Sequence, residues 1–260
     1  MEQEVPLYQM QPQTRFSNRA PDYARFRPSY PASAIAWILA GLKTPTELIA
    51  ADIGAGTGIS SRLLAERGLQ VWAIEPNLAM QGVAQFHPRV TFQTATAEQT
   101  DLPPASVDLV TCFQAFHWCD PHPALREFCR ILRPSGRLAL VWNERDRQDP
   151  FTAAYSQVIR QASGNHPAEN RLQATNPLEL LQNSPLFHQV RQRTFVYRQE
   201  LNLSGLIGRA TSTSYLPREG PGFEQLVTCL TELHQTWKDD QEKVCLSYHT
   251  NIFLAEANSI

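Results

Sequence analysis

The sequence predicts an α/β protein built on an open, doubly wound sheet whose strands are mostly parallel. Apolar segments of strand length alternate with amphipathic segments of helical length between residues 48 and 142, as such a sheet requires. A glycine-dense turn, Asp52-Ile-Gly-Ala-Gly-Thr-Gly58, joins the first strand segment to the helix after it. With 260 residues, 42% hydrophobic and 18% charged, the chain suits one such domain with an elaboration.

The first half of the chain supplies most of the predicted sheet. Residues 18–42 have a helical pattern that ends at Gly41 and Pro45, because both residue types interrupt helices. Beyond them, apolar runs predict strands at 48–53, 70–75, 90–94, 107–113 and 137–142. The segments between predict helices at 60–67, 77–86 and 123–132, the second of them with Asn77 as its N-cap.

After Asn143 the alternation changes, which predicts an inserted helical cap. A helix at 151–162 precedes polar loops at 163–176, a strand at 190–197 and helices at 203–211 and 223–237. A final strand at 244–255 is expected to have a bulge or a break near Tyr248-His249. We therefore divide the chain into an N-terminal segment with a lid helix (1–45), a cofactor-binding core (46–142), a cap insertion over the active site (143–185) and a C-terminal completion of the sheet with a helical excursion (186–260).

The glycine turn and the acid at the end of the next strand predict a nucleoside-binding site. Glycines lack Cβ, so they adopt strained turns and let a ligand approach the backbone closely. The following helix presents free N–H groups to an anionic ligand group. Glu75 lies seventeen residues after Gly58, and an acid at about this distance can accept both ribose hydroxyls.

The spacing of the glycines then distinguishes between cofactors. A dinucleotide fingerprint has the form Gly-x-Gly-x-x-Gly, whereas Gly54, Gly56 and Gly58 alternate strictly and Asp52 precedes them. This pattern resembles motif I of the class I S-adenosylmethionine-dependent methyltransferases. Further segments resemble the methyltransferase type 11 group, of the sort that includes trans-aconitate methyltransferases: Phe26-Arg-Pro-Ser-Tyr-Pro31, Glu75-Pro-Asn77, Thr96-Ala-Glu98, Gln114-Ala-Phe-His-Trp118 and Val141-Trp-Asn-Glu-Arg-Asp146.

The resemblance implies a Rossmann-like sheet of seven strands, parallel except for one strand near the C-terminus, with S-adenosyl-L-methionine at the carboxyl ends of the first four strands. Glu75 would bind the ribose, and Asp52 would fix the turn and meet the methionine ammonium either through water or directly. The methionine half would lie against Gly54, Ala55, Gly56, Thr57 and Gly58, and against Phe113, Gln114 and Ala115. Adenine would lie against Pro76, Asn77, Thr96, Ala97 and Glu98; many relatives have Asp at the position of Thr96.

Other roles stay open at this point. His117 and Trp118 would lie near the transferring methyl group, and His117 is the one base candidate, although it could equally be a packing or capping residue. Trp118 could be core. Tyr23 and Arg27 would either close over the cofactor as an N-terminal lid or only pack their helix onto the sheet.

The acceptor is expected to be a small molecule, with an organic acid favoured by Arg145, Arg147, Arg209 and Arg218. The loop after the fourth strand lacks the [Asp/Asn]-Pro-Pro-aromatic element of enzymes that methylate nucleic-acid amino groups, and the net charge is −2, so we expect no nucleic-acid partner. No apolar stretch is long enough to span a membrane, and five scattered cysteines suit a cytoplasmic protein without disulfides.

We expect no metal site, because the cluster of His117, Cys119 and His122 has no second cluster to complete it. Two alternatives to catalysis by a methyltransferase stay open. One is a non-catalytic module that binds S-adenosylmethionine or regulates a partner. The other, disfavoured by the glycine spacing, is an NAD-dependent oxidoreductase. The sequence predicts no oligomeric state.

Overall fold

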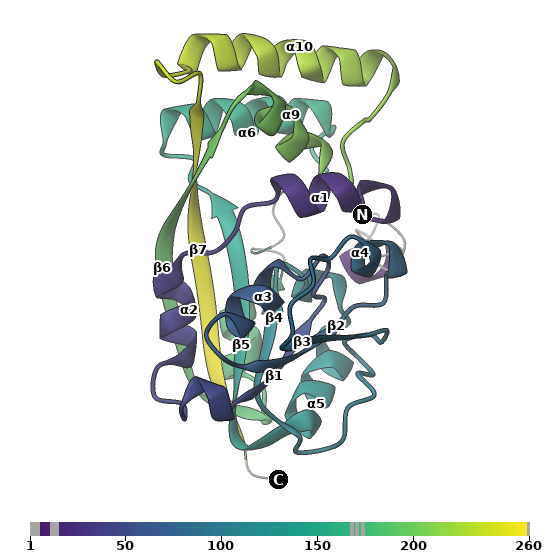
Figure 1. Ribbon diagram of the computed structural model, residues 1–260, viewed down its shortest axis with the longest axis vertical. Coiled ribbons are helices and arrows are strands. Elements are labelled where there is room, and N and C mark those ends of the chain that lie inside the picture. The colour runs from purple at the N-terminus through teal and green to yellow at the C-terminus, as the bar shows by residue number, and fades with distance from the viewer. Residues whose placement is uncertain (1–5, 11–15, 167–168, 170–171, 173–174, 259–260) are drawn as a thin grey trace.

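The computed structural model describes residues 6–10, 16–166, 169, 172 and 175–258, and its centre is a seven-stranded sheet (Figure 1). The strand order is β3-β2-β1-β4-β5-β7-β6. The pairs from β3 to β5 are parallel, and β7 is antiparallel to both of its neighbours. The predicted mostly parallel sheet with one antiparallel strand is confirmed. The strands are β1 (Ile49–Ile53), β2 (Gln70–Ile74), β3 (Val90–Gln93), β4 (Val107–Phe113), β5 (Leu132–Arg145), β6 (Phe187–Leu201) and β7 (Val244–Ala257).

Helices cover both faces of the sheet, which is why its central strands are mostly apolar. On one face, α2 (Ala32–Leu39) and α3 (Ile59–Ala65) pack on residues such as Ala50 and Leu109. On the other face, α5 (Pro121–Ile131) and α8 (Pro177–Gln182) pack on residues such as Ala51 and Val110. Successive strand residues face opposite layers, so a strand buried on both faces carries no polar alternation.

The helical pattern at 18–42 forms two helices, because Pro28 and Pro31 separate them. α1 (Ala20–Phe26) has Arg27 as its C-cap, and α2 begins after Pro31. Proline removes a backbone donor and restricts the residue before it, so the chain is extended between the two helices. α1 leaves the sheet and lies beneath the cap, whereas α2 stays against the sheet (Figure 1).

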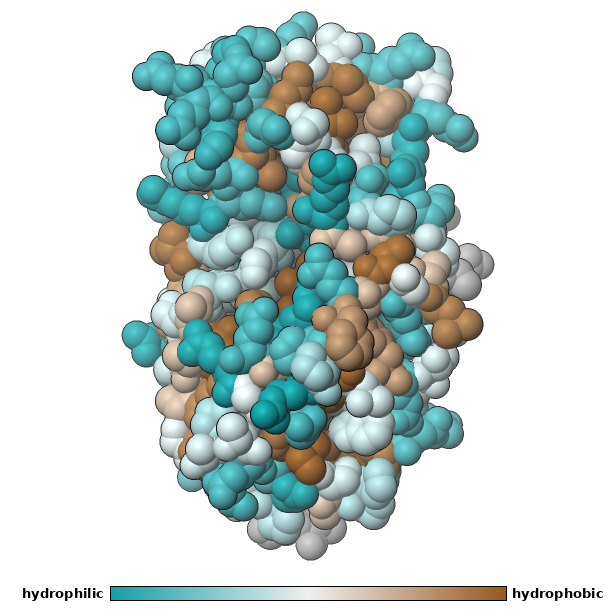
Figure 2. Space-filling model, in the orientation of Figure 1, coloured by the Kyte–Doolittle hydropathy of each residue, from teal (hydrophilic) through white to brown (hydrophobic). Residues whose placement is uncertain are grey.

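The cap lies beyond the carboxyl ends of the parallel strands and has its own apolar core. It contains α6 (Pro150–Ala162), α9 (Leu203–Thr211) and α10 (Gly220–Trp237), packed with the adjoining parts of β6 and β7 (Figure 1). The cap therefore includes more of the chain than the segment 143–185. By contrast, α8 from that segment packs on the same face of the sheet as α5. Figure 2 shows apolar side chains within the cap, framed by hydrophilic ones.

The last strand is continuous and in regular register around Tyr248-His249, so the expected bulge or break there is wrong. Tyr248 pairs with Arg145 and Tyr197, and His249 pairs with Glu144 and Val196. Ladder pairing on both sides satisfies the backbone there, so the polar residues do not interrupt the strand.

Among the described residues, no helix is both long and apolar enough to cross a membrane. The short helix α4 (Leu78–Gly82) follows β2, with the Asn77 side chain capping its first turn as predicted.

Candidate active site

The glycines of the turn after β1 have left-handed φ angles, and they let the backbone pass close to the end of the neighbouring strand, β4. Gly54 has φ +64°, and a Cβ built there would lie 2.4 Å from Ala115 Cβ, at the end of β4. Gly56 has φ +58°, and its Cβ would lie 3.3 Å from Met80 Cε and 3.8 Å from Tyr23 Cε1. Side chains rarely adopt this conformation, so glycine is required both for the turn and for the space beside it.

Glu75 follows β2 and faces the glycine turn. Its Oε2 accepts the Gly56 N–H at 2.8 Å, and its Oε1 accepts the Asn77 N–H at 2.9 Å. Burial raises the pKa of this carboxyl, while the two backbone donors lower it and the negative charge of Asp52 raises it further; the net direction is upward. Each carboxylate oxygen has a second lone pair, so Glu75 can still accept two ligand hydroxyls.

A cavity of about 310 Å³ lies between the glycine turn, Glu75 and the loops that follow β3 and β4. Its position at the carboxyl ends of β1 and β4, where the strand order reverses, is the usual ligand site of an open α/β sheet. It is lined by Tyr8, Phe16, Tyr23, Gly54, Gly56, Glu75, Pro76, Asn77, Met80, Thr96, Ala97, Glu98, Gln114, Ala115, Trp118, Cys119 and Asp120.

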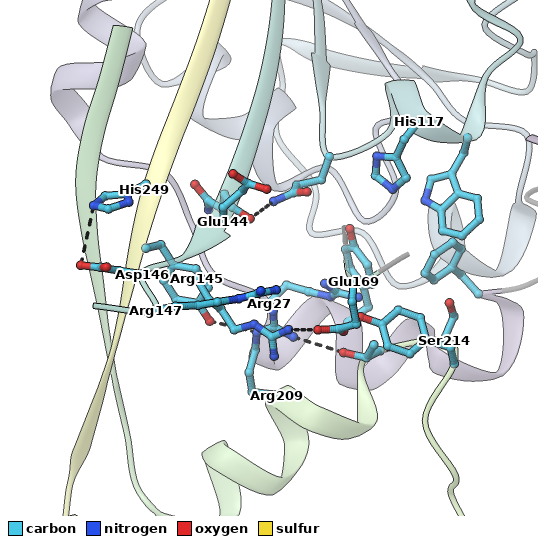
Figure 3. A pocket seen from close by; sticks show the side chains of 18 of the residues that line it. Arg27, His117, Glu144, Arg145, Asp146, Arg147, Glu169, Arg209, Ser214 and His249 are labelled. Atoms are coloured by element: carbon cyan, nitrogen blue, oxygen red, sulfur yellow. Dashed lines mark hydrogen bonds and ion pairs between the residues drawn. The ribbon is translucent and has the colours of Figure 1, made fainter. Parts of the chain in front are cut away.

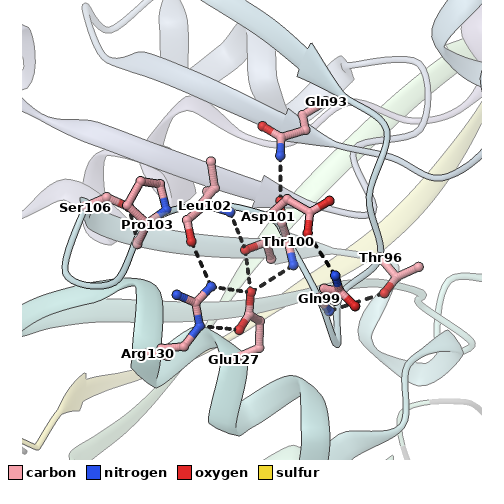
Figure 4. A network of polar contacts seen from close by, with 10 residues as sticks. All are labelled: Gln93, Thr96, Gln99, Thr100, Asp101, Leu102, Pro103, Ser106, Glu127 and Arg130. Atoms are coloured by element: carbon pink, nitrogen blue, oxygen red, sulfur yellow. Dashed lines mark hydrogen bonds and ion pairs between the residues drawn. The ribbon is translucent and has the colours of Figure 1, made fainter.

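The loop that forms the wall at Thr96, Ala97 and Glu98 is held by α5 (Figure 4). Glu127 accepts the Thr100 N–H at 2.8 Å and the Thr100 hydroxyl at 2.6 Å. Arg130 donates to Glu127 and, at 2.8 Å, to the Leu102 carbonyl. Burial raises the pKa of Glu127, but the hydrogen bonds from Arg130 and Thr100 outweigh it and leave that pKa below its ordinary value.

Asp52 lies beneath the turn and does not line this cavity. It is 0% exposed, and it accepts hydroxyl hydrogens from Ser60 and Ser61, each at 2.6 Å, and from Thr111 at 2.8 Å. Burial raises its pKa, and the three hydroxyl donors lower it by a smaller amount. Asp52 therefore joins the end of β1 to α3 and β4, and it does not line the cavity itself.

A second cavity of about 300 Å³ adjoins the first on the side of the cap (Figure 3). The two cavities share four lining residues, namely Phe16, Tyr23, Gln114 and Trp118. The other residues of the second cavity are mostly polar or charged, and they come from segments far apart in the chain: Arg27, His117, Asn143, Glu144, Arg145, Asp146, Arg147, Gln148, Glu169, Arg209, Thr213, Ser214, Tyr215, Tyr248 and His249.

Gln114 forms the wall between the cavities in an unusual backbone conformation. It follows β4 directly and has φ +55°, which is uncommon for a residue with a side chain. Its Nε2 donates to the Asn143 carbonyl at 2.7 Å, so the end of β4 is tied to β5. Strained conformations of this kind are typical of functional sites.

Arg209 is the buried cation of the second cavity. It is 7% exposed, its Nε donates to the Tyr248 hydroxyl at 3.2 Å and its Nη1 donates to the Thr213 hydroxyl at 3.4 Å. Burial lowers its pKa, but Tyr248 and Tyr155 outweigh burial and raise that pKa above its ordinary value. Within the part of the chain that the structure describes, no carboxylate forms an ion pair with it. A buried charge without a counter-ion is costly, which favours an anionic ligand here.

Several other charges of this cavity have partners. Arg145 pairs with Glu169, which also accepts the Tyr215 hydroxyl. His249 Nε2 lies 3.6 Å from Asp146 Oδ2. Arg27 donates to the Ser212 carbonyl at 3.0 Å, and its guanidinium lies 4.6 Å from the centre of the Tyr23 ring. Arg218, which the sequence grouped with these arginines, instead pairs with Asp22 outside both cavities.

His117 lines the second cavity, and its ring already accepts one hydrogen bond. Trp142 Nε1–H donates to His117 Nδ1 at 3.2 Å. Trp indole nitrogen is only a donor, so the proton of a neutral His117 ring is on Nε2. In this state Nδ1 cannot take a proton from a ligand, and His117 serves as a hydrogen-bond donor.

Most of the predicted cofactor-site residues come together around the first cavity, and the exceptions are informative. Arg27 and His117 line the second cavity, and Tyr23, Gln114 and Trp118 line both. Ala55 and Phe113 lie at a small adjoining cavity of about 20 Å³. Asp52, Thr57 and Gly58 line none of these three cavities. The sequence missed Tyr8, Phe16, Met80, Cys119 and Asp120, of which Cys119 and Asp120 directly follow a recognised motif.

Comparison with known proteins places this geometry in a family. Residues 51–140 match the family described as a methyltransferase domain. An uncharacterised methyltransferase of Mycobacterium tuberculosis is 36% identical over 187 residues, which cover 72% of this chain and 73% of that protein. An uncharacterised methyltransferase of Schizosaccharomyces pombe is 32% identical over 151 residues, 57% of this chain and 60% of that one.

Solved structures share the fold at lower identity. A type II methyltransferase of Anaeromyxobacter dehalogenans aligns with a TM-score of 0.63 at 24% identity, over 90% of this chain and 98% of that one. Phosphoethanolamine N-methyltransferase 2 of Haemonchus contortus, solved with S-adenosyl-L-methionine, aligns with a TM-score of 0.56 at 19% identity, over 99% of this chain and 61% of that one. At such identities the likeness concerns the fold alone. Together with the sequence relatives, however, it means that this chain belongs to the class I S-adenosylmethionine-dependent methyltransferases, in the family of the matched methyltransferase domain.

Proposed function

We propose that the first cavity binds S-adenosyl-L-methionine and that the second binds a small organic acid, which receives the methyl group. The observation that carries the proposal is the shared wall of the two cavities. A ligand in each would meet at Phe16, Tyr23, Gln114 and Trp118. Methyl transfer needs such a meeting, because the acceptor atom must approach the methyl carbon in line and away from water.

The residues of the first cavity fit this cofactor. Glu75 would accept the ribose hydroxyls, since its two oxygens lie at the cavity and keep acceptor capacity. The backbone at Gly54 and Gly56 would lie against the methionine half, because neither position has a Cβ to fill that space. The bound cofactor would supply a methyl group that is already electrophilic. The protein's own task would then be to hold the two ligands and exclude water, and orientation of this kind accounts for about 7–11 kcal/mol of a barrier.

An acid suits the second cavity for two reasons. Arg209 is a buried cation that bonds to neutral hydroxyls, and a ligand carboxylate would complete its charge balance. A carboxylate oxygen is also a nucleophile without losing a proton, so it requires no general base. That agrees with a His117 ring whose Nδ1 is occupied by Trp142, and we assign His117 the role of a donor to the acceptor.

Two measurements test the proposal. Calorimetry should detect binding of S-adenosylhomocysteine to the wild type, and Glu75→Ala should weaken it about 100-fold, by about 3 kcal/mol, because charged hydrogen bonds are lost. Glu66→Ala, which removes an exposed acid at the end of α3, should leave that affinity unchanged.

A library of small organic acids, incubated with methyl-labelled cofactor, should then yield a labelled ester. Unchanged affinity in Glu75→Ala would refute the ribose assignment. Tight cofactor binding with label transferred only to amines, or to no acceptor, would refute the acid substrate, and the second result would favour a regulatory module.

A further inference from the structure

α1 lines the cofactor and acceptor cavities, although it is held mainly by the cap. The segment from 16 to 27 contributes Phe16 and Tyr23 to both cavities and Arg27 to the second. Phe16 meets Trp118 edge to face at 5.8 Å between ring centres. On the core side, Ser17 accepts a hydrogen bond of 3.0 Å from the Asn77 side chain.

A buried arginine just before α1, Arg19 in the 3-10 helix Ser17–Arg19, makes three of the polar contacts that join this segment to the cap. Arg19 is 7% exposed, and its guanidinium donates to three backbone carbonyls: Thr211 at 2.8 Å, Thr213 at 3.1 Å and Leu216 at 2.7 Å. These carbonyls lie at the C-terminal end of α9 and in the loop after it, where helix carbonyls lack intrahelical partners and carry partial negative charge. Arg19 therefore caps α9 from another helix.

Weaker contacts join the same two segments. Asp22 accepts the Thr211 hydroxyl at 3.0 Å and pairs with Arg218 at 3.0 Å. The aromatic ring of Phe26 lies directly against α9, since a Cβ on Gly208 would lie 2.3 Å from it. α1 and the segment 203–216 thus form a continuous polar and apolar contact, with Arg19 at its centre.

The segment that Arg19 holds is also the floor of the second cavity. It presents Arg209, Thr213 and Ser214 to that cavity, and Thr213 is both a carbonyl partner of Arg19 and a hydroxyl partner of Arg209. The 211–216 loop therefore links the segment before α1 to the second cavity.

We propose that Arg19 is a positioning residue that couples the two cavities: a ligand that orders α1 against the first cavity also orders the 203–216 segment of the second. This inference rests on the proposed cofactor site. Coupling of this kind is reciprocal, so an acceptor bound against 203–216 would in turn tighten cofactor binding. Ordering alone is sufficient, because a second ligand binds more tightly to a segment that the first has already ordered.

Amide hydrogen exchange with S-adenosylhomocysteine as the probe tests the coupling without a known acceptor. In the wild type, the probe should slow exchange in the glycine turn at 54–58 and, by about tenfold, in 203–216, although the described residues of 203–216 do not line the first cavity. Arg19→Gln should abolish the protection of 203–216 and leave that of 54–58. Arg25→Gln, which changes an exposed arginine on α1, should leave both unchanged.

Each other outcome has a definite meaning. Protection of 54–58 without 203–216 in the wild type, or protection of both segments in Arg19→Gln, overturns the coupling and leaves the proposed function intact. Absence of protection at 54–58 refutes the cofactor site itself. If Arg19→Gln does not fold, Asp22→Asn weakens the same contact at a more exposed position, and it should reduce the protection of 203–216 alone; full protection there would also overturn the proposal.

Discussion

The two cavities are similar in size, but they are built in opposite ways. The proposed cofactor cavity is formed mainly by the turns and loops that follow β1, β2, β3 and β4, and backbone shape and one carboxylate would set its specificity. The proposed acceptor cavity is formed by side chains from α1, β5, α9 and β7, and it contains several arginines and acids. Backbone geometry tolerates little change, whereas a set of side chains can be altered singly. The difference implies that cofactor binding is the fixed property of this enzyme and acceptor choice the adjustable one.

The strongest test of that contrast is Gly54→Ala. A left-handed residue with Cβ costs about 1–2 kcal/mol, and a Cβ 2.4 Å from Ala115 Cβ adds an overpacking cost of about 1–3 kcal/mol. We expect loss of measurable S-adenosylhomocysteine binding in calorimetry and a Tm lowered by about 5–10 °C. Gly82→Ala is the matched control, because nothing lies within 4 Å of its added Cβ. If Gly54→Ala binds the probe normally, the cofactor does not lie against this turn.

Arg209→Gln should change the acceptor side alone. Loss of a charged hydrogen bond to the acceptor costs about 1.5–3 kcal/mol, so the KM for the acid identified by label transfer should rise about 10- to 100-fold. The Kd of S-adenosylhomocysteine should stay within about twofold, since Arg209 lies outside the first cavity. Arg160→Gln, an exposed arginine on α6, controls for charge. An unchanged KM would mean that Arg209 does not contact the acceptor.

Two buried acids should give pH dependences of opposite sign. The pKa of Glu75 is raised in the folded state, so its contribution to stability is full below its unfolded pKa and is lost as pH rises through the folded value. The pKa of Glu127 is lowered, so its contribution is present above the unfolded pKa and is lost as pH falls through the folded value.

Urea unfolding of the ligand-free protein between about pH 3 and 7 measures both effects. The stability of the wild type minus that of Glu75→Gln should fall as pH rises, and the same difference for Glu127→Gln should rise. If both differences changed with pH in the same direction, burial would not raise the pKa of Glu75 above its unfolded value.

His117→Ala should have the smallest effect. Removal of a general base usually costs about 10²- to 10⁴-fold in rate, but a donor that only orients the acceptor should cost less than about tenfold. The pH dependence of kcat should then be the same in the variant and the wild type. A loss in the larger range, with disappearance of a titration near neutral pH, would restore His117 to the role of base.

Most residues that line the first cavity could be named from the sequence, because the features that bring them together are local. The positive φ angles of the glycines, the acid at the end of β2 and the carboxyl ends of parallel strands all follow from short segments. The sequence did not predict the full burial of Asp52, although the hydroxyl donors Ser60 and Ser61 were visible in it. It could not assemble the acceptor side, because Arg209, Tyr248 and Arg145 become neighbours only through strand pairing and cap packing.

The long strands β5 and β7 have a consequence for how such enzymes can be re-engineered. Each strand carries buried sheet residues at one end and acceptor-facing residues at the other: Leu138 and Arg145 on β5, Ala255 and Tyr248 on β7. The second cavity therefore cannot be exchanged by replacing one segment between two loops. A graft from a relative would have to bring both strands in the same register, because a slip of one residue would turn every acceptor-facing side chain to the opposite face.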